Sequence, residues 1–183
     1  MSSAERRSAG PLLALLLLAG CGEVASDLFP SGADKRPPVV AGTVGPAVGQ
    51  LAPDFTLPSV AGGTVTLYGA LASAPGAVLY FTMWCPICDS HMSDMQTWVI
   101  PDHPDVPFFA IDYVSGSVAA AGDAQAASGW GTTRFRVLAD VGASVEGFYQ
   151  APMAVVVVDR NHVVQLNGEY TRERLTAVLG ALP

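Results

Sequence analysis

Two cysteines three positions apart, Cys85 and Cys88, are the residues best suited to chemistry. Thiol–disulfide exchange needs a thiolate, an exposed attacking sulfur and a second sulfur that resolves the mixed disulfide, and a C-x-x-C pair at a helix start provides all three. The peptide dipoles and free N–H groups at a helix N-terminus favour the anionic sulfur of Cys85. Cys88 lies about one turn further along and is more shielded. We therefore predict that Cys85 is the nucleophile and Cys88 the resolving thiol.

Two structural explanations of the pair are weaker. A structural zinc site needs four ligands, and the sequence has no second C-x-x-C and no paired histidines. A static disulfide between such close cysteines closes so small a loop that its entropic stabilisation is slight. We therefore expect no resident metal ion and no other bound cofactor.

The elements that position the pair are a buried strand over residues 77–82 and a helix that begins at or just after Cys85. Pro86 falls in the first turn of that helix, where the missing N–H leaves no bond unmade. Two extended segments flank the turn at Gly62-Gly63, which predicts a short N-terminal β-hairpin. The rest of the chain predicts strands over 107–111, 135–138, 153–158 and 162–166, and helices over 117–128, 141–149 and 171–182. This order predicts an α/β fold with a central mixed sheet flanked by helices.

The N-terminus has the layout of a secretory signal. Arg6 and Arg7 precede an apolar stretch over residues 11–20, which at about 1.5 Å per residue is too short to span a bilayer. The sequence Leu18-Ala19-Gly20-Cys21 resembles the lipobox of bacterial lipoproteins, whose cysteine becomes the lipidated first residue. A plain secretory signal with a chance cysteine is the alternative. We predict a signal peptide over residues 1–20, lipid on Cys21, and a membrane-anchored protein on the periplasmic or another extracytoplasmic face.

The remaining composition suggests a tether followed by one domain. Residues 22–49 are rich in Gly, Pro, Ala and Ser, so we expect a lipidated flexible tether over 21–49 and a folded domain over 50–183. The 183 residues are 50% hydrophobic, enough for one core. The net charge of −7, with no basic run longer than a pair such as Arg6-Arg7, argues against nucleic-acid binding. Expected partners are protein thiols or disulfides, an upstream redox donor or acceptor, and the membrane through Cys21.

Residues 52–57, Ala-Pro-Asp-Phe-Thr-Leu, and residues 80–88, Tyr-Phe-Thr-Met-Trp-Cys-Pro-Ile-Cys, resemble the redoxin group of TlpA/ResA-like thiol-disulfide oxidoreductases. The resemblance implies a thioredoxin fold from about Gln50 onward and an enzyme that exchanges disulfides. Its Trp-Cys-x-x-Cys motif places Trp84 as a flank shielding the thiols. Its cis-proline loop, which docks the partner's backbone, would fall at Ala151 and Pro152.

The sequence departs from this family beside the cysteines. Leu79 stands, by spacing, where thioredoxin has a buried aspartate, and His91 stands where many TlpA-like proteins have a glutamate. On a helix His91 shares a face with Cys88, so it could accept or hold a proton near the dithiol. Alternatively, His91 is a solvent-facing helix residue.

Two other functions remain open at this stage. Peroxiredoxins share the fold and the Pro-Asp-Phe segment, and Thr82 stands three residues before the first cysteine, as in their motif. Val78 stands where that motif needs a proline, and no arginine that would polarise a peroxide is identifiable. A Sco-like copper-binding protein is the third possibility, because soft ligands select Cu(I) and the pair is followed by His91, Met92 and Met95. Sco-type motifs, however, usually have the spacing C-x-x-x-C.

Overall fold

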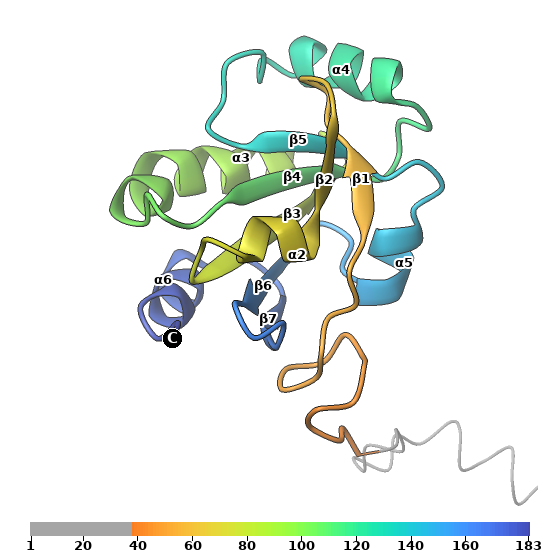
Figure 1. Cartoon of the computed structure of the whole chain (residues 1–183). Coiled ribbons are helices and arrows are strands. Elements are labelled where there is room, and N and C mark those ends of the chain that lie inside the picture. The colour runs from red at the N-terminus through yellow and green to blue at the C-terminus, as the bar shows by residue number, and fades with distance from the viewer. Residues whose placement is uncertain (1–37) are drawn as a thin grey trace, which may run out of the picture. The chain divides into compact units, whose positions relative to one another are not determined.

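The computed structural model describes residues 38–183, and a five-stranded mixed sheet lies at its centre (Figure 1). The strand order is β5-β4-β3-β6-β7. Strands β3, β4 and β5 run parallel, whereas β6 runs antiparallel to both β3 and β7. The strands are β3 (Gly76–Thr82), β4 (Phe108–Asp112), β5 (Arg136–Ala139), β6 (Val155–Asp159) and β7 (Val164–Gly168). Every residue of β3 is buried, as expected for a strand covered on both faces.

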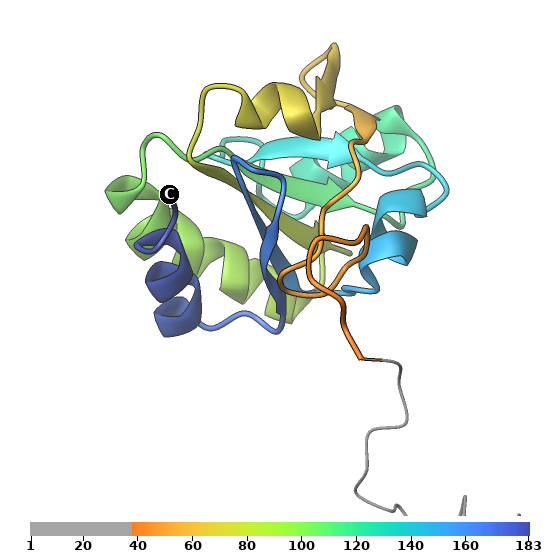
Figure 2. The same ribbon diagram turned by 60° about the horizontal axis from the view of Figure 1, so that its bottom comes forward.

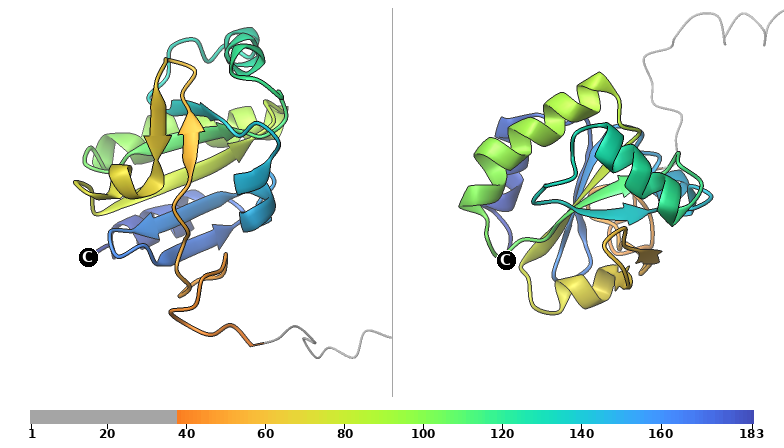
Figure 3. Two further views of the ribbon diagram at one scale, coloured as in Figure 1. Left: turned by 45° about the vertical axis from the view of Figure 1, so that its right-hand side comes forward. Right: turned by 90° about the horizontal axis from the view of Figure 1, so that it is seen from above.

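Helices cover both faces of this sheet (Figures 2 and 3). One core lies beneath α3 (Pro86–Asp94) and α6 (Arg172–Leu179), and the other beneath α2 (Leu67–Leu71) and α5 (Ser144–Tyr149). A fifth helix, α4 (Val118–Ala127), connects β4 to β5. The predicted thioredoxin-like α/β fold is therefore confirmed.

The predicted N-terminal hairpin is also present. Strands β1 (Thr56–Pro58) and β2 (Thr64–Thr66) pair antiparallel. Gly62 and Gly63, with φ of 99° and 71°, make the turn that other residues adopt only with strain. The hairpin stands beside β5 in Figure 3, where Val60 N–H donates to Val137 O at 3.0 Å.

Two helical segments were not predicted from the sequence. Helix α2 follows β2 without a break, because the Thr66 hydroxyl accepts a hydrogen bond from Gly69 N–H at 3.1 Å and caps the helix. Helix α3 continues into a π turn (Met95–Val99) and a 3-10 turn (Ile100–Asp102). The chain therefore stays helical from the disulfide to Asp102.

The folded chain begins before the predicted boundary at Gln50. Residues 39–183 form one unit, in which Gly49 N–H donates to Val164 O at 2.9 Å and the Asn167 side-chain amide donates to Pro46 O at 3.0 Å. The glycines of this segment serve tight turns, with φ of 78° at Gly42 and 88° at Gly49, rather than a tether. The predicted signal peptide, Cys21 and the first part of the predicted tether lie outside the described residues. No helix in residues 38–183 is long and apolar enough to cross a membrane.

Candidate active site

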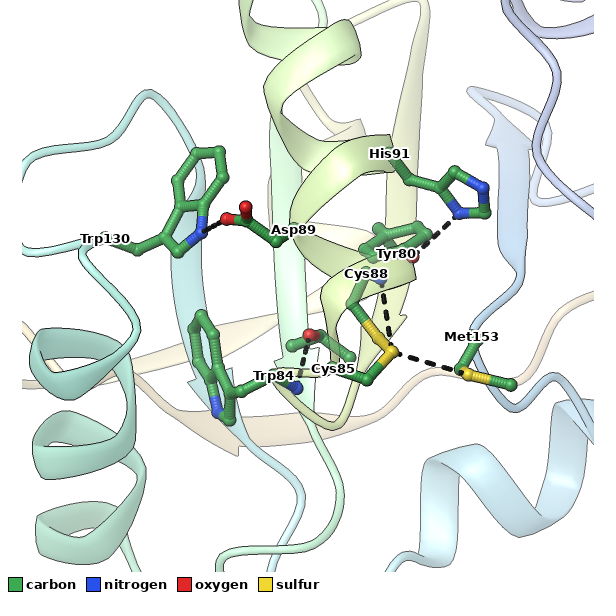
Figure 4. Close-up of a disulfide and its surroundings, with 9 residues drawn as sticks. Tyr80, Trp84, Cys85, Cys88, Asp89, His91, Trp130 and Met153 are labelled. Carbon is green, nitrogen blue, oxygen red and sulfur yellow. Dashed lines mark hydrogen bonds between the residues drawn. A yellow bond between two sulfur atoms is a disulfide. The ribbon is translucent and has the colours of Figure 1, made fainter.

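Cys85 and Cys88 are joined in a disulfide at the start of α3, shortly after the end of β3 (Figure 4). Cys85 is the N-cap of α3, and its Sγ accepts a hydrogen bond from Cys88 N–H at 3.1 Å. Pro86 occupies the start of the helix, as predicted. Cys88 is fully buried and Cys85 is half-buried. Cys85 is therefore the sulfur that a partner can reach.

Trp84 is fixed beside the disulfide by its backbone and by its ring. Its φ of 58° lies in the left-handed region, and its N–H donates to the hydroxyl of buried Thr82 at 3.1 Å. Its indole N–H donates to Asp112 Oδ2 at 2.7 Å. Asp112 is almost fully buried and also accepts from the N–H groups of Val114 and Ser115. Trp84 thus ties the disulfide loop to the carboxyl end of β4.

A second tryptophan holds the first turn of α3. Trp130 donates its indole N–H to Asp89 Oδ1 at 2.6 Å, and Asp89 directly follows Cys88. A carboxylate in the first turn is favourable at a helix N-terminus. Sequence reasoning missed both this pair and Asp112. Asp112 could have been found as a polar residue ending a buried strand next to the cysteine-bearing one, whereas Trp130 lies in a loop and gives no periodic signal.

His91 lies on α3, is half-buried, and faces two tyrosines. Its Nδ1 is 3.0 Å from the Tyr80 hydroxyl, and its ring packs 5.0 Å from the ring of Tyr170. In Figure 4 the imidazole points toward Tyr80, and in the described chain no hydrogen bond joins it to either cysteine. His91 is therefore half-buried against two tyrosines rather than wholly in solvent. Burial lowers the pKa of His91, and the nearby carboxylate of Asp94 opposes that shift.

Tyr80, unlike Leu79, shares a core with Cys88. Side chains alternate along a strand, so Leu79 faces the opposite core. Burial, reinforced by the neighbouring Tyr113, raises the pKa of Tyr80, and the phenol keeps its proton. It can therefore donate to Nδ1 of a neutral imidazole at His91.

The loop before β6 approaches the disulfide in an unexpected way. No peptide bond in residues 38–183 is cis, so the expected cis-proline at Pro152 is wrong. The chain instead turns through Gln150 and Met153, whose φ values of 50° and 56° are left-handed. Ala151 is buried, and Met153 places its Sδ 3.6 Å from Cys85 Sγ (Figure 4). The sequence predicts Met153 only as the first residue of an apolar strand.

The methionines of α3 and its π-turn extension lie in the same core as Cys88. Met92 and Met95 are fully buried in the core beneath α3, because they lie on the helix face that packs against the sheet. Of the ligands expected for a Sco-like copper site, His91 has its Nδ1 bonded to Tyr80 rather than directed at a cysteine.

The AhpC/TSA family matches residues 48–167. The chain belongs to this family. Among solved structures, it is similar to Mycobacterium tuberculosis DsbF, with 25% identity, a TM-score of 0.57 and coverage of 70% of this chain and 95% of that one. A secreted Mycobacterium tuberculosis disulfide oxidoreductase homologous to Escherichia coli DsbE has 23% identity and a TM-score of 0.53, with coverage of 70% and 96%. Comparison with curated protein sequences gave no match.

A peroxide-related protein shares the same fold. Peroxidoxin BcpB of Mycobacterium tuberculosis has 16% identity and a TM-score of 0.58, with coverage of 74% of this chain and 97% of that one. At this identity the likeness concerns the fold alone. The family, together with the likeness to DsbF, supports an oxidoreductase.

Proposed function

We propose that this protein is a thiol-disulfide oxidoreductase that acts on protein partners through the Cys85–Cys88 couple, in the manner of the TlpA/ResA-like group. The observation that carries the proposal is the disulfide at the start of α3, with one sulfur accessible and the other buried. The N-terminus of α3 and the N–H of Cys88 both favour a thiolate at Cys85.

The exchange proceeds in two steps. A partner thiolate attacks Cys85 Sγ, the Cys85–Cys88 bond breaks, and Cys88 leaves as a thiolate that takes up a proton. A second partner thiolate then attacks the partner sulfur of the mixed disulfide and releases Cys85. The partner loses two electrons and two protons, and the protein gains them as two thiols. The reverse sequence, in which Cys85 attacks and Cys88 resolves, reduces a partner disulfide.

Mixed-disulfide trapping tests these roles. Cys88→Ser leaves Cys85 able to attack but unable to be resolved, so it should accumulate partner adducts that a reductant releases. Cys85→Ser leaves only the buried sulfur and should trap far fewer partners. Equal trapping by the two variants would contradict the assignment, and an insulin-reduction assay on the wild-type protein checks the reaction class.

We also propose that the protein is exported and carries lipid on Cys21, which anchors it on an extracytoplasmic face. Support comes from Arg6 and Arg7, the apolar stretch that follows, and the lipobox-like sequence. Mass spectrometry of the mature N-terminus tests this. An unmodified Cys21 or an uncleaved chain would contradict it.

Thiol peroxidase activity is the second candidate. Membership of the AhpC/TSA family and the position of Thr82 favour it. The Thr82 hydroxyl, however, accepts a hydrogen bond from Trp84 N–H. Peroxide consumption by the reduced protein, compared with its rate of insulin reduction, separates the two activities. A peroxide rate that far exceeds the insulin rate would favour the peroxidase.

A further inference from the structure

Three sulfur atoms from two separate segments meet just beyond the carboxyl end of β3. Cys85 and Cys88 supply two of them, and the thioether of Met153 lies 3.6 Å from Cys85 Sγ (Figure 4). We propose that the reduced protein binds one Cu(I) ion through the thiolates of Cys85 and Cys88 and the thioether of Met153.

The spacing of the sulfurs suits a three-coordinate metal. With metal–sulfur bonds of about 2.3 Å, the sulfurs of a planar three-coordinate site lie about 4 Å apart. Cys85 and Met153 are already close to that separation. A dithiol reductant first cleaves the disulfide and frees the two cysteine sulfurs to move apart. Binding then displaces two thiol protons and transfers no electrons.

The donor set selects Cu(I) over zinc. Thiolate and thioether sulfurs are soft ligands, which favour Cu(I), whereas a structural zinc site needs four N, O or S ligands. Within residues 38–183, no group of three or more His, Cys, Asp or Glu side chains could hold a metal ion. The imidazole closest along the helix, His91, has its Nδ1 engaged by Tyr80.

The backbone holds Met153 in place for this role. Ala154 N–H donates to Ala151 O at 3.1 Å, and Phe81 N–H donates to Ala154 O at 3.1 Å, so the turn is fastened to the end of β3. Met153 keeps a left-handed φ of 56°, a strained conformation of the kind that clusters at functional sites. Its side chain is 37% exposed, so an ion bound there can be reached and exchanged from solvent.

The local charge is also favourable. Two thiolates and one Cu(I) carry a net charge of −1, which the N-terminus of α3 stabilises. The N–H of Cys88 already points at Cys85 Sγ.

The test is an anaerobic titration of the dithiol-reduced protein with Cu(I) in competition with a colorimetric Cu(I) chelator. We expect one Cu(I) per chain, and a Met153→Leu variant that binds at least about tenfold more weakly. The matched control is Met83→Leu, because Met83 is similarly exposed, at 42%, and also lies close to the cysteines in sequence. It should bind as the wild type does. The oxidised protein should bind no Cu(I).

X-ray absorption at the copper edge supplies the second measurement. It should report three sulfur neighbours in the wild-type protein and two in Met153→Leu, whose reduced thiols should still number two by titration. Equal affinity and equal sulfur number for wild type and Met153→Leu would overturn the proposal, as would equal weakening by Met83→Leu. Because these outcomes concern metal binding alone, they are independent of whether the insulin-reduction assay succeeds.

Discussion

Trp84 reaches the neighbouring strand through a hydrogen bond to Asp112, a buried carboxylate. A hydrogen bond to a charged group contributes about 1.5–3 kcal/mol, more than a neutral one, because the unsatisfied charge is expensive to bury. The same bond holds the residue that directly precedes Cys85, so stability and the position of the disulfide are linked at this residue.

Trp84→Phe should therefore lower the free energy of unfolding by about 1.5–3 kcal/mol or more, because it keeps an aromatic ring but removes the indole N–H that bonds to Asp112, together with the five-membered part of the ring. Trp98→Phe is the control, since Trp98 is 58% exposed and its ring face toward Arg172 is retained. That change should stay within about 0.5 kcal/mol. Urea unfolding of the three proteins measures both values, and equal losses would show that the bond to Asp112 is not responsible.

His91 makes stability depend on pH. Because burial lowers its folded pKa below 6.5, the unfolded chain binds the imidazole proton more readily than the folded chain does. The contribution of His91 to the free energy of unfolding is therefore fully present above pH 6.5. It is lost as the pH falls from there through the folded pKa. His91→Gln should flatten the decline in free energy of unfolding between about pH 7 and 5. Parallel declines in the two proteins would rule out His91 as the cause.

The same pair of proteins tests whether His91 also tunes the dithiol. Acting through Tyr80, the imidazole would produce an inflection in the rate of dithiol exchange below pH 6.5, and His91→Gln would remove it. Superimposable pH–rate curves would limit His91 to a structural role.

Strand β3 is the element on which the site depends, since it leads directly into the disulfide loop and pairs with both β4 and β6. Its first residue, Gly76, lies against the C-terminal end of the chain and against β6. A Cβ at this position would come within 2.9 Å of Val158 O and 2.8 Å of Leu182 Cδ1. Leu182 can rotate away, but the backbone oxygen cannot.

Gly76→Ala should therefore destabilise the protein by about 1–3 kcal/mol through overpacking. Gly147→Ala in α5 is the matched control, because nothing lies within 4 Å of its Cβ position. In a helix alanine is favoured over glycine, so this variant should be stabilised by up to about 1 kcal/mol. Thermal unfolding of both variants checks the opposite signs, and a shift in the same direction would contradict the packing argument.

At the scale of the molecule, the segment before Gln50 belongs to the fold. It covers one edge of the sheet through hydrogen bonds to Val164 and Asn167 on β7. Without it, β7 would present unpaired backbone groups as an exposed edge strand.

A chain beginning at Val39 should fold and keep dithiol exchange, whereas a chain beginning at Gln50 should unfold at lower urea concentration and associate more readily. The physical reason is the loss of the edge contacts, each worth about 0.5–1.5 kcal/mol. Urea midpoints and light scattering of the two chains measure the difference. Identical midpoints would mean that residues 39–49 contribute nothing to the folded unit.

The sequence by itself determined the features that depend on local pattern. The C-x-x-C pair, Pro86 at the helix start, the glycine turn of the hairpin and the order of strands and helices all follow from spacing and from backbone preferences within a few residues. These were sufficient to predict the fold and to place Cys85 at a helix N-terminus.

Only the tertiary structure decided what surrounds the disulfide. Trp84 and Asp112 are 28 residues apart, Asp89 and Trp130 are 41 apart, and Cys85 and Met153 are 68 apart. The first and third pairs meet because β4 lies parallel to β3 while β6 runs antiparallel to it, and Trp130 reaches Asp89 from the loop before β5; no local signal specifies these contacts. The left-handed turn at Met153 and the hydrogen bonds of Pro46, Gly49 and Gln50 to β7 likewise depend on partners distant in sequence. That is why the expected cis-proline and the expected domain boundary were wrong although the motif between them was placed correctly.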